Sequence, residues 1–157
     1  MLRWPGVRAR WTDAILDEVF KHLEENRPDL DPARLDRTRA LMNSAIRDVL
    51  VEGYEQRIAR LSLPDPGDRH VLAAAIQARA SVIVTSNTAD FPATVLERHG
   101  IVAQRPDDFL LELCETDASK LHAVIGDIAR TWNDPADAVL ASLAASVPRT
   151  VARLASR

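Results

Sequence analysis

The clearest indication of the fold class is the segment Ser81-Val82-Ile83-Val84-Thr85-Ser86-Asn87-Thr88-Ala89-Asp90. Its opening part, 82–85, is short, rich in β-branched residues and continuously apolar, which is typical of a strand covered on both faces. An alanine-rich helix is expected just before it, over 69–79, with Asp68 at its start. Because a helix leads directly into a buried strand, the pattern indicates an α/β fold with a parallel sheet.

The segments on either side extend this pattern. Further short strands are expected over 48–52 and 101–103, with a short helix over 92–98 between the last two strands. Helices are expected over 12–26, which Thr12 would cap, and from Asp31-Pro32 to Arg47. In the second of these, the expected buried positions are Leu35, Leu41, Met42, Ala45 and Ile46. Four more helices are expected after Pro106, over 107–115, 117–131, 136–145 and 148–155. The chain therefore divides into an α/β domain over 1–115 and a helical C-terminal extension over 116–157.

The composition is that of an ordinary globular protein. The 157 residues carry a net charge of -3, with 46% hydrophobic residues, so a disordered or fibrous chain is excluded. No apolar run approaches the ~20 residues that cross a bilayer, and the N-terminus lacks the apolar centre of a signal peptide. The one cysteine, Cys114, excludes an intramolecular disulfide and is expected in the core. We therefore expect a cytoplasmic protein without a membrane partner.

Acidic residues lie before and after the strand expected over 82–85. Asp90 and the closer Asn87 lie in the loop that follows it, while Asp65 and Asp68 open the helix that leads into it. A helix of ~16 Å, at about 1.5 Å per residue, would carry its own start back to the carboxyl edge of the sheet. Ligand sites in such folds form at that edge. Two or three converging acids would bind a hard cation such as Mg²⁺ or Mn²⁺, which acidifies bound water and neutralises a phosphate.

Each of these residues also has an ordinary structural interpretation. Asp68 could cap the helix that follows it, and Asp65, within Pro-Asp-Pro-Gly, could serve a turn. Asp90 could cap the helix after Pro92. Glu18 lies outside the apolar stripe of its helix and could be one more solvated acid, while His70, on an apolar helix, could be a packed core residue.

Several blocks in this order and spacing resemble the PIN-domain family. The blocks are Trp11–Val19 (Trp-Thr-Asp-Ala-Ile-Leu-Asp-Glu-Val), Leu63–Ala75 (Leu-Pro-Asp-Pro-Gly-Asp-Arg-His-Val-Leu-Ala-Ala-Ala), Val82–Pro92 and Pro106–Leu110. They are most similar to the bacterial subgroup that includes VapC-type toxins, and Pro148–Leu154 resembles a tail found in that subgroup. The resemblance covers roughly residues 7–115, and several blocks in register are far more specific than any single acid.

The resemblance implies a three-layer α/β/α fold and an endoribonuclease that depends on Mg²⁺ or Mn²⁺. It also implies an RNA substrate, an antitoxin protein as partner and a homo-oligomer. The family's metal ligands fall on Glu18, Asp68 and a position in the 85–91 block, which is either Asn87 or Asp90. Because Asn87 carries no charge, we assign the catalytic and metal-binding roles to Glu18, Asp68 and Asp90, with Asn87 as a neutral ligand or a residue that holds a water molecule.

One departure from the family concerns the N-terminus. Members of the family open with a strand ending in a metal-binding Asp and a helix, both before the block at Trp11, and the chain begins too late to contain them. We expect an N-terminally incomplete fold that is truncated, degenerate in activity, or completed by another chain. A gap in the sheet would expose strand edges, so we expect the chain to oligomerise there or to cover the gap with its N-terminal residues.

Two functions follow. The first is a metal-dependent endoribonuclease, the toxin component of a type II toxin–antitoxin pair. The second is a catalytically degenerate protein on the same scaffold that acts by binding an antitoxin or another protein. A different small α/β phosphotransfer enzyme is the third option, but the sequence holds no glycine-rich phosphate loop.

Overall fold

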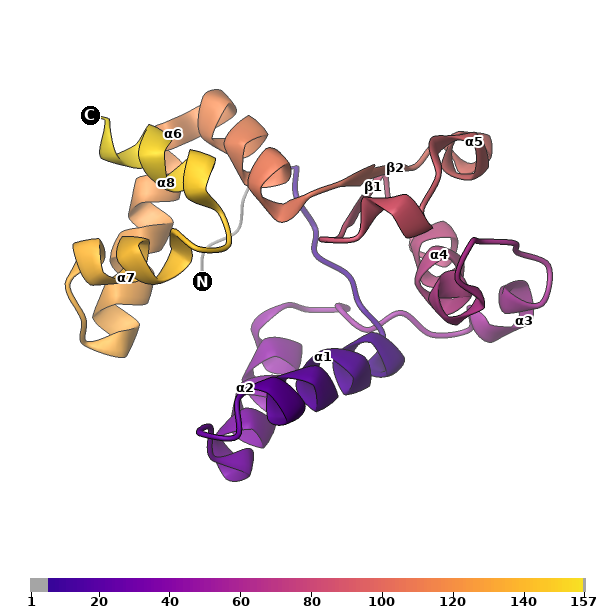
Figure 1. Cartoon of the computed structure of the whole chain (residues 1–157), viewed down its shortest axis with the longest axis horizontal. Coiled ribbons are helices and arrows are strands. Elements are labelled where there is room, and N and C mark those ends of the chain that lie inside the picture. The colour runs from indigo at the N-terminus through magenta and orange to yellow at the C-terminus, as the bar shows by residue number, and fades with distance from the viewer. Residues whose placement is uncertain (1–5, 157) are drawn as a thin grey trace. The chain divides into compact units, whose positions relative to one another are not determined.

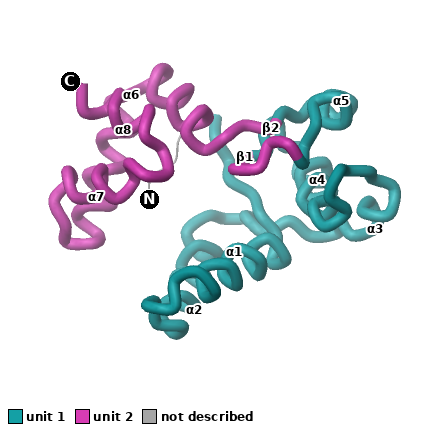
Figure 2. The backbone as a smooth tube through the Cα atoms, in the orientation of Figure 1, with its two compact units in different colours: residues 1, 3–83, 90–102 teal, residues 2, 84–89, 103–157 magenta. Residues whose placement is uncertain are grey.

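The computed structural model describes residues 6–156, and the described chain forms two compact units (Figures 1 and 2). The first comprises residues 6–83 and 90–102 of the described chain, and the second comprises 84–89 and 103–156. The described chain passes between the two units three times, after residues 83, 89 and 102. Each unit has its own buried residues, so each is described by itself.

A helical hairpin opens the first unit. Helix α1 (Asp13–Asn26) begins where predicted because Thr12, only 1% exposed, accepts a hydrogen bond from the backbone N–H of Ile15 through its hydroxyl oxygen at 3.0 Å. Helix α2 (Pro32–Ala45) begins with Asp31 as cap, as predicted. The two helices bury a shared cluster made by Leu16, Phe20 and Leu35.

A second apolar cluster supports the helix that leads into the sheet. The short helix α3 (Glu55–Ile58) was not predicted; it packs with α4 (Arg69–Gln77) around Tyr54, Ala73 and Ala74. A 3₁₀ turn (Pro66–Asp68) enters α4 directly. Most of the circumference of α4 is buried, as its apolar sequence predicts.

Strands β1 (Val82–Val84) and β2 (Val102–Gln104) form a short parallel pair. The backbone N–H of Val102 donates to the Ser81 carbonyl at 3.0 Å, and that of Thr85 to the Gln104 carbonyl at 2.9 Å. Helix α5 (Ala93–Leu96) and the 3₁₀ turn Glu97–His99 join the strands, and Gly100 turns the chain with a φ of +67°. The predicted α/β class with a short parallel sheet and a helical C-terminal region is therefore confirmed.

Some local predictions were wrong. The segment 48–52 is no strand: only an isolated parallel bridge joins Leu50 to Trp11. In α2, Leu41 is 61% exposed and Ala45 is exposed as well, so the expected buried stripe extends less far along the helix. Val84 is 45% exposed, so β1 is not fully covered. In each case the pairing or burial of the segment depends on a distant part of the chain that packs against it. The local sequence pattern does not encode that partner.

Three helices make up most of the second unit. Helix α6 (Pro106–Trp132) bends at Asp117, which has non-helical backbone angles and whose carboxylate accepts the Lys120 N–H at 3.0 Å. Two helical segments, over 107–115 and 117–131, were predicted here, and the bend at Asp117 falls at their junction. Helices α7 (Ala136–Leu143) and α8 (Pro148–Ala155) pack on α6. Cys114 is buried in α6, as expected.

None of the helices in residues 6–156 is both long and apolar enough to cross a membrane. The division at 115/116, inside α6, stays a prediction.

Candidate functional site

The predicted acids of the first unit come from three separate segments. Glu18 lies on α1, Asp65 and Asp68 at the 3₁₀ turn before α4, and Asp90 at the end of a 3₁₀ turn (Thr88–Asp90). His70 lies in the first turn of α4, two residues after Asp68. The apolar body of α4 is buried, which fixes the backbone that carries Asp68 and His70.

Asp68 lies in an acidic neighbourhood. Its pKa is raised above the ordinary value, first by burial and then by the negative charges of Asp90, Asp65 and Glu18, while His70 acts in the opposite direction. Asp68 stands at the N-cap position of α4, yet its side chain accepts no capping hydrogen bond there. The interpretation of Asp68 as an ordinary helix cap is therefore not supported. Burying a carboxyl among like charges costs stability, which a bound cation would offset.

Asp65 has a different role. Its Oδ1 accepts a hydrogen bond from the backbone N–H of Gly67 at 2.7 Å, which stabilises the turn into α4. The turn interpretation of Asp65 is thus confirmed, and Asp65 contributes charge to the neighbourhood of Asp68 without being needed as a ligand.

His70 contacts one of the predicted acids, a role that its position in an apolar helix did not predict. Its Nε2 lies 3.0 Å from Oε1 of Glu18, within ion-pair distance but without the alignment of a hydrogen bond. The imidazole is 13% exposed and the Glu18 side chain 64% exposed. The feature of the sequence that could have indicated this contact is a polar residue, His70, on an otherwise apolar helix, two residues after the candidate ligand Asp68.

Asn87 and Asp90 follow β1. Asp90 belongs to the first unit and Asn87 to the second, where the Asn87 N–H donates to the Thr85 hydroxyl oxygen at 3.1 Å. Helix α5 has Pro92 at its N-cap position, and this residue provides no side-chain cap. The role of Asp90 as a cap of that helix stays an alternative interpretation. The metal-ligand roles of Glu18, Asp68, Asp90 and Asn87 stay predictions.

The candidate acids are chemically suited to bind a cation, but their side chains are not arranged around one. Carboxylate oxygens are the ligands that Mg²⁺ and Mn²⁺ prefer, and Asp90, Asp65 and Glu18 all act on the pKa of Asp68. Across residues 6–156, however, no group of three or more His, Cys, Asp or Glu side chains is arranged to hold a metal ion. Side chains as exposed as Glu18 would therefore have to turn inward to reach a divalent cation.

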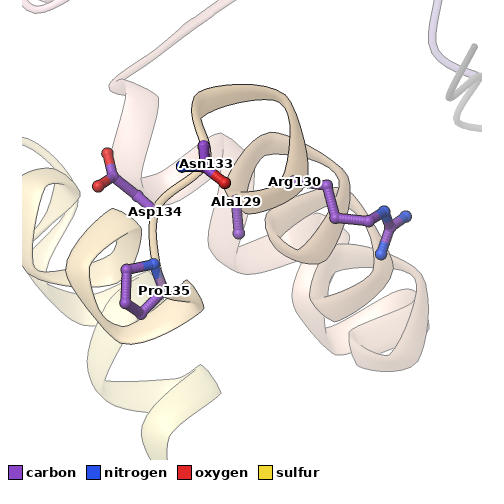
Figure 3. A pocket seen from close by; sticks show the side chains of 5 residues that line it. All are labelled: Ala129, Arg130, Asn133, Asp134 and Pro135. Atoms are coloured by element: carbon purple, nitrogen blue, oxygen red, sulfur yellow. The ribbon is translucent and has the colours of Figure 1, made fainter.

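The second unit has a hollow of about 390 Å³ where α6 passes into α7 (Figure 3). It is lined by Ala129, Arg130, Asn133, Asp134 and Pro135. Arg130 is ion-paired with Asp127, and Asn133 turns the chain with a φ of 56°. No nucleophile or pair of catalytic acids lines this hollow, so the acids of the first unit remain the candidate site.

Comparison with known proteins identifies the family of the chain. A family model described as "PIN domain" matches residues 2–89, more than half of the chain, and this segment contains Glu18, Asp68 and Asn87. The chain belongs to the PIN-domain family. A second model, described as "VapC50 C-terminal domain", matches residues 106–156 of this PIN-domain chain, the segment of α6 to α8. The resemblance to VapC-type proteins is therefore confirmed.

One relative extends the same likeness. The PIN-domain chain is 38% identical over 104 residues to the Mycobacterium tuberculosis (strain ATCC 25618 / H37Rv) protein named "Putative ribonuclease VapC50". The match covers 64% of this chain and 61% of that protein, so the chain spans less than two thirds of its relative's length. No solved structure matches the chain.

Proposed function

We propose that the chain is a VapC-type endoribonuclease that requires a divalent cation, and that it is the toxin component of a type II toxin–antitoxin pair. The observation that carries the proposal is the PIN-domain match over residues 2–89, which includes Asp68 with its raised pKa among other acids. The relative named as a ribonuclease supports the same activity.

Glu18, Asp68 and Asp90 would hold Mg²⁺ or Mn²⁺, and Asn87 would add a neutral oxygen. When bound, such an ion supplies an acidified water and neutralises phosphate charge. The chain's own contribution is to hold these carboxylates close together. The buried α4 holds Asp68 beside Asp90 and Glu18, so their mutual repulsion is relieved when a cation binds and RNA phosphate can then approach.

The test is cleavage of a fluorescently labelled single-stranded RNA by the full chain with Mn²⁺, with Mg²⁺, and with EDTA. Products are expected with the cations and none with EDTA. Equal cleavage in EDTA would contradict a metal-dependent reaction. The comparison of the two cations at equal concentration measures which one the site prefers.

The partners are part of the proposal. RNA is the substrate, an antitoxin protein is the partner that restrains the activity, and the chain associates with copies of itself. Co-expression with the protein encoded next to it, followed by purification of a stable complex that no longer cleaves RNA, tests the antitoxin. A neighbouring protein that neither binds nor inhibits would contradict that assignment.

A second function is favoured by one observation: within the described residues, no three acidic or histidine side chains are arranged to hold an ion. A PIN-domain protein whose site does not close around a cation would act by binding a protein partner alone. The two functions are separated by the RNA assay together with a titration of Mn²⁺. Binding of the antitoxin without Mn²⁺ uptake or cleavage supports the second function.

A further inference from the structure

The contact between α1 and α4 places a histidine against one of the proposed metal ligands. His70 Nε2 and Glu18 Oε1 are 3.0 Å apart. The two residues differ in freedom, because the imidazole is only 13% exposed and stands on a buried helix, whereas the Glu18 side chain is 64% exposed. A long, exposed glutamate samples many rotamers unless a fixed group holds it.

The second observation concerns the imidazole itself. Both ring nitrogens are buried, and neither has a correctly aligned hydrogen-bond partner within the described chain. A buried polar nitrogen without a partner is costly, and the Glu18 carboxylate is the acceptor within reach of Nε2. A hydrogen bond from the Nε2–H to this oxygen would satisfy the buried nitrogen and hold the carboxylate.

The third observation is the direction of the contact. His70 is two residues from Asp68 in the sequence. The negative charge of Glu18 helps to raise the pKa of Asp68, so the two carboxylates lie close enough to interact. Holding Glu18 against His70 therefore keeps its carboxylate near the start of α4, where Asp68 lies. If the imidazole instead drew Glu18 away from the cation, its removal would strengthen metal binding, and the sign of the effect separates these two cases.

We propose that His70 is a positioning residue, which donates its Nε2–H to Glu18 and thereby orients that carboxylate toward the cation shared with Asp68. This inference rests on the proposed function, since it assumes that Glu18 is a ligand. Groups that hydrogen-bond to metal ligands typically contribute about 10–100-fold to metal affinity.

The test uses the full chain and Mn²⁺ alone, with binding measured by titration calorimetry and by the loss of the free-ion electron paramagnetic resonance signal. His70→Leu keeps the approximate size of the side chain but has no donor, and His70→Gln keeps an N–H near the position of Nε2. We expect the leucine variant to bind Mn²⁺ about 10–100-fold more weakly and the glutamine variant to recover most of the affinity.

The matched control is Asp17→Asn. Asp17 is the neighbour of Glu18 on α1, but its ion pair is with Arg39 on α2. The control should leave Mn²⁺ affinity unchanged, so any loss in His70→Leu is not a general effect of losing an ion pair from α1. Unchanged or stronger Mn²⁺ binding by a folded leucine variant would overturn the proposal.

A metal-free measurement reads the contact directly. Ring ¹⁵N chemical shifts identify the nitrogen of His70 that carries the proton, with the signal assigned by its loss in His70→Gln. We expect a proton on Nε2 and a shift of that signal in Glu18→Gln but not in Asp17→Asn. A His70 signal that does not change in Glu18→Gln would overturn the proposal even if the leucine variant fails to fold.

The outcomes also separate the two proposals. If the wild-type chain takes up no Mn²⁺, the proposed function is overturned as well. If it takes up Mn²⁺ and the His70 substitutions do not change the affinity, only the positioning role is overturned.

Discussion

The first turn of α8 is capped by a side chain from another helix. Val147, at the N-cap position of α8, provides no side-chain cap. Instead, the Asp107 carboxylate of α6 accepts hydrogen bonds from the backbone N–H of Thr150 at 2.9 Å, from the Thr150 hydroxyl at 2.8 Å and from the Arg149 N–H at 3.0 Å. A single carboxylate therefore satisfies the helix start and holds α8 on α6.

We predict that Asp107→Asn lowers the free energy of unfolding by about 1–2 kcal/mol, because one amide oxygen replaces two charged acceptors at a helix N-terminus. Urea denaturation followed by circular dichroism measures the change. Asp134→Asn, an exposed aspartate of the same unit, is the control and should change stability far less. Equal stability of the two variants would contradict the capping role.

The same carboxylate predicts a pH dependence. Burial acts to raise the pKa of Asp107, but the hydrogen bonds from Thr150 and Arg149 together outweigh it and hold the pKa below the ordinary value. Because the folded pKa is the lower one, the stabilisation is complete above the unfolded value of about 4 and is lost as pH falls through the folded pKa. The wild type should lose more stability than Asp107→Asn in urea titrations taken down to about pH 3. Parallel losses in the two proteins would contradict this assignment.

At the scale of single elements, the helix starts were the most predictable feature. Thr12, Asp31-Pro32 and Asp117 each begin a helix where the sequence indicates one, because capping depends on residues within one turn of each other. The strands at 82–84 and 102–104 were also predicted to within a residue or two.

Substitutions of Thr12 test whether the start of α1 is set by its local cap. Thr12→Ala removes the acceptor for the Ile15 N–H from a side chain that is 1% exposed, and we expect a loss of about 1 kcal/mol or somewhat more. Thr12→Ser keeps the hydroxyl and should recover most of that loss. Thermal melting of both variants measures the difference, and a serine variant as unstable as the alanine variant would show that packing of the methyl group, not capping, dominates.

The wrong predictions concern elements whose structure depends on a distant part of the chain. Segment 48–52 has β-branched residues but pairs only through Leu50 and Trp11, and a strand needs a neighbour along its length. Leu41 matches the helical period yet finds no surface to cover it. Among the candidate acids, Asp68 and Asp90 were noticed from their positions around the predicted strand, and Glu18 only through the family resemblance. The contact of His70 with Glu18 joins positions far apart in sequence and was not predicted.

At the scale of the whole molecule, the short sheet predicts association. Within the described chain, β1 pairs with β2 alone, and Val84 and Val102 are 45% and 49% exposed. Exposed apolar strands with unpaired edges favour pairing with another chain. We predict a dimer or larger species in analytical ultracentrifugation, shifted toward monomer by Val102→Lys. A well-behaved wild-type monomer that melts cooperatively would contradict this prediction.

For the whole molecule, we propose that the acids around Asp68 form the cation site of a PIN-domain ribonuclease. Two aspartates at the same turn offer a matched comparison: Asp68 has a raised pKa and no capping role, whereas Asp65 serves the turn through Gly67. Both substitutions to asparagine remove one negative charge and keep the size of the side chain.

The decisive measurement is the rate of Mn²⁺-dependent RNA cleavage by wild type, Asp68→Asn and Asp65→Asn under identical conditions. Since even groups behind metal ligands contribute about 10–100-fold, Asp68→Asn should lower the rate by at least about 100-fold. Asp65→Asn, which keeps the amide oxygen as acceptor for Gly67, should stay within several-fold of wild type. Cleavage that persists undiminished in a folded Asp68→Asn variant would contradict a cation site around Asp68.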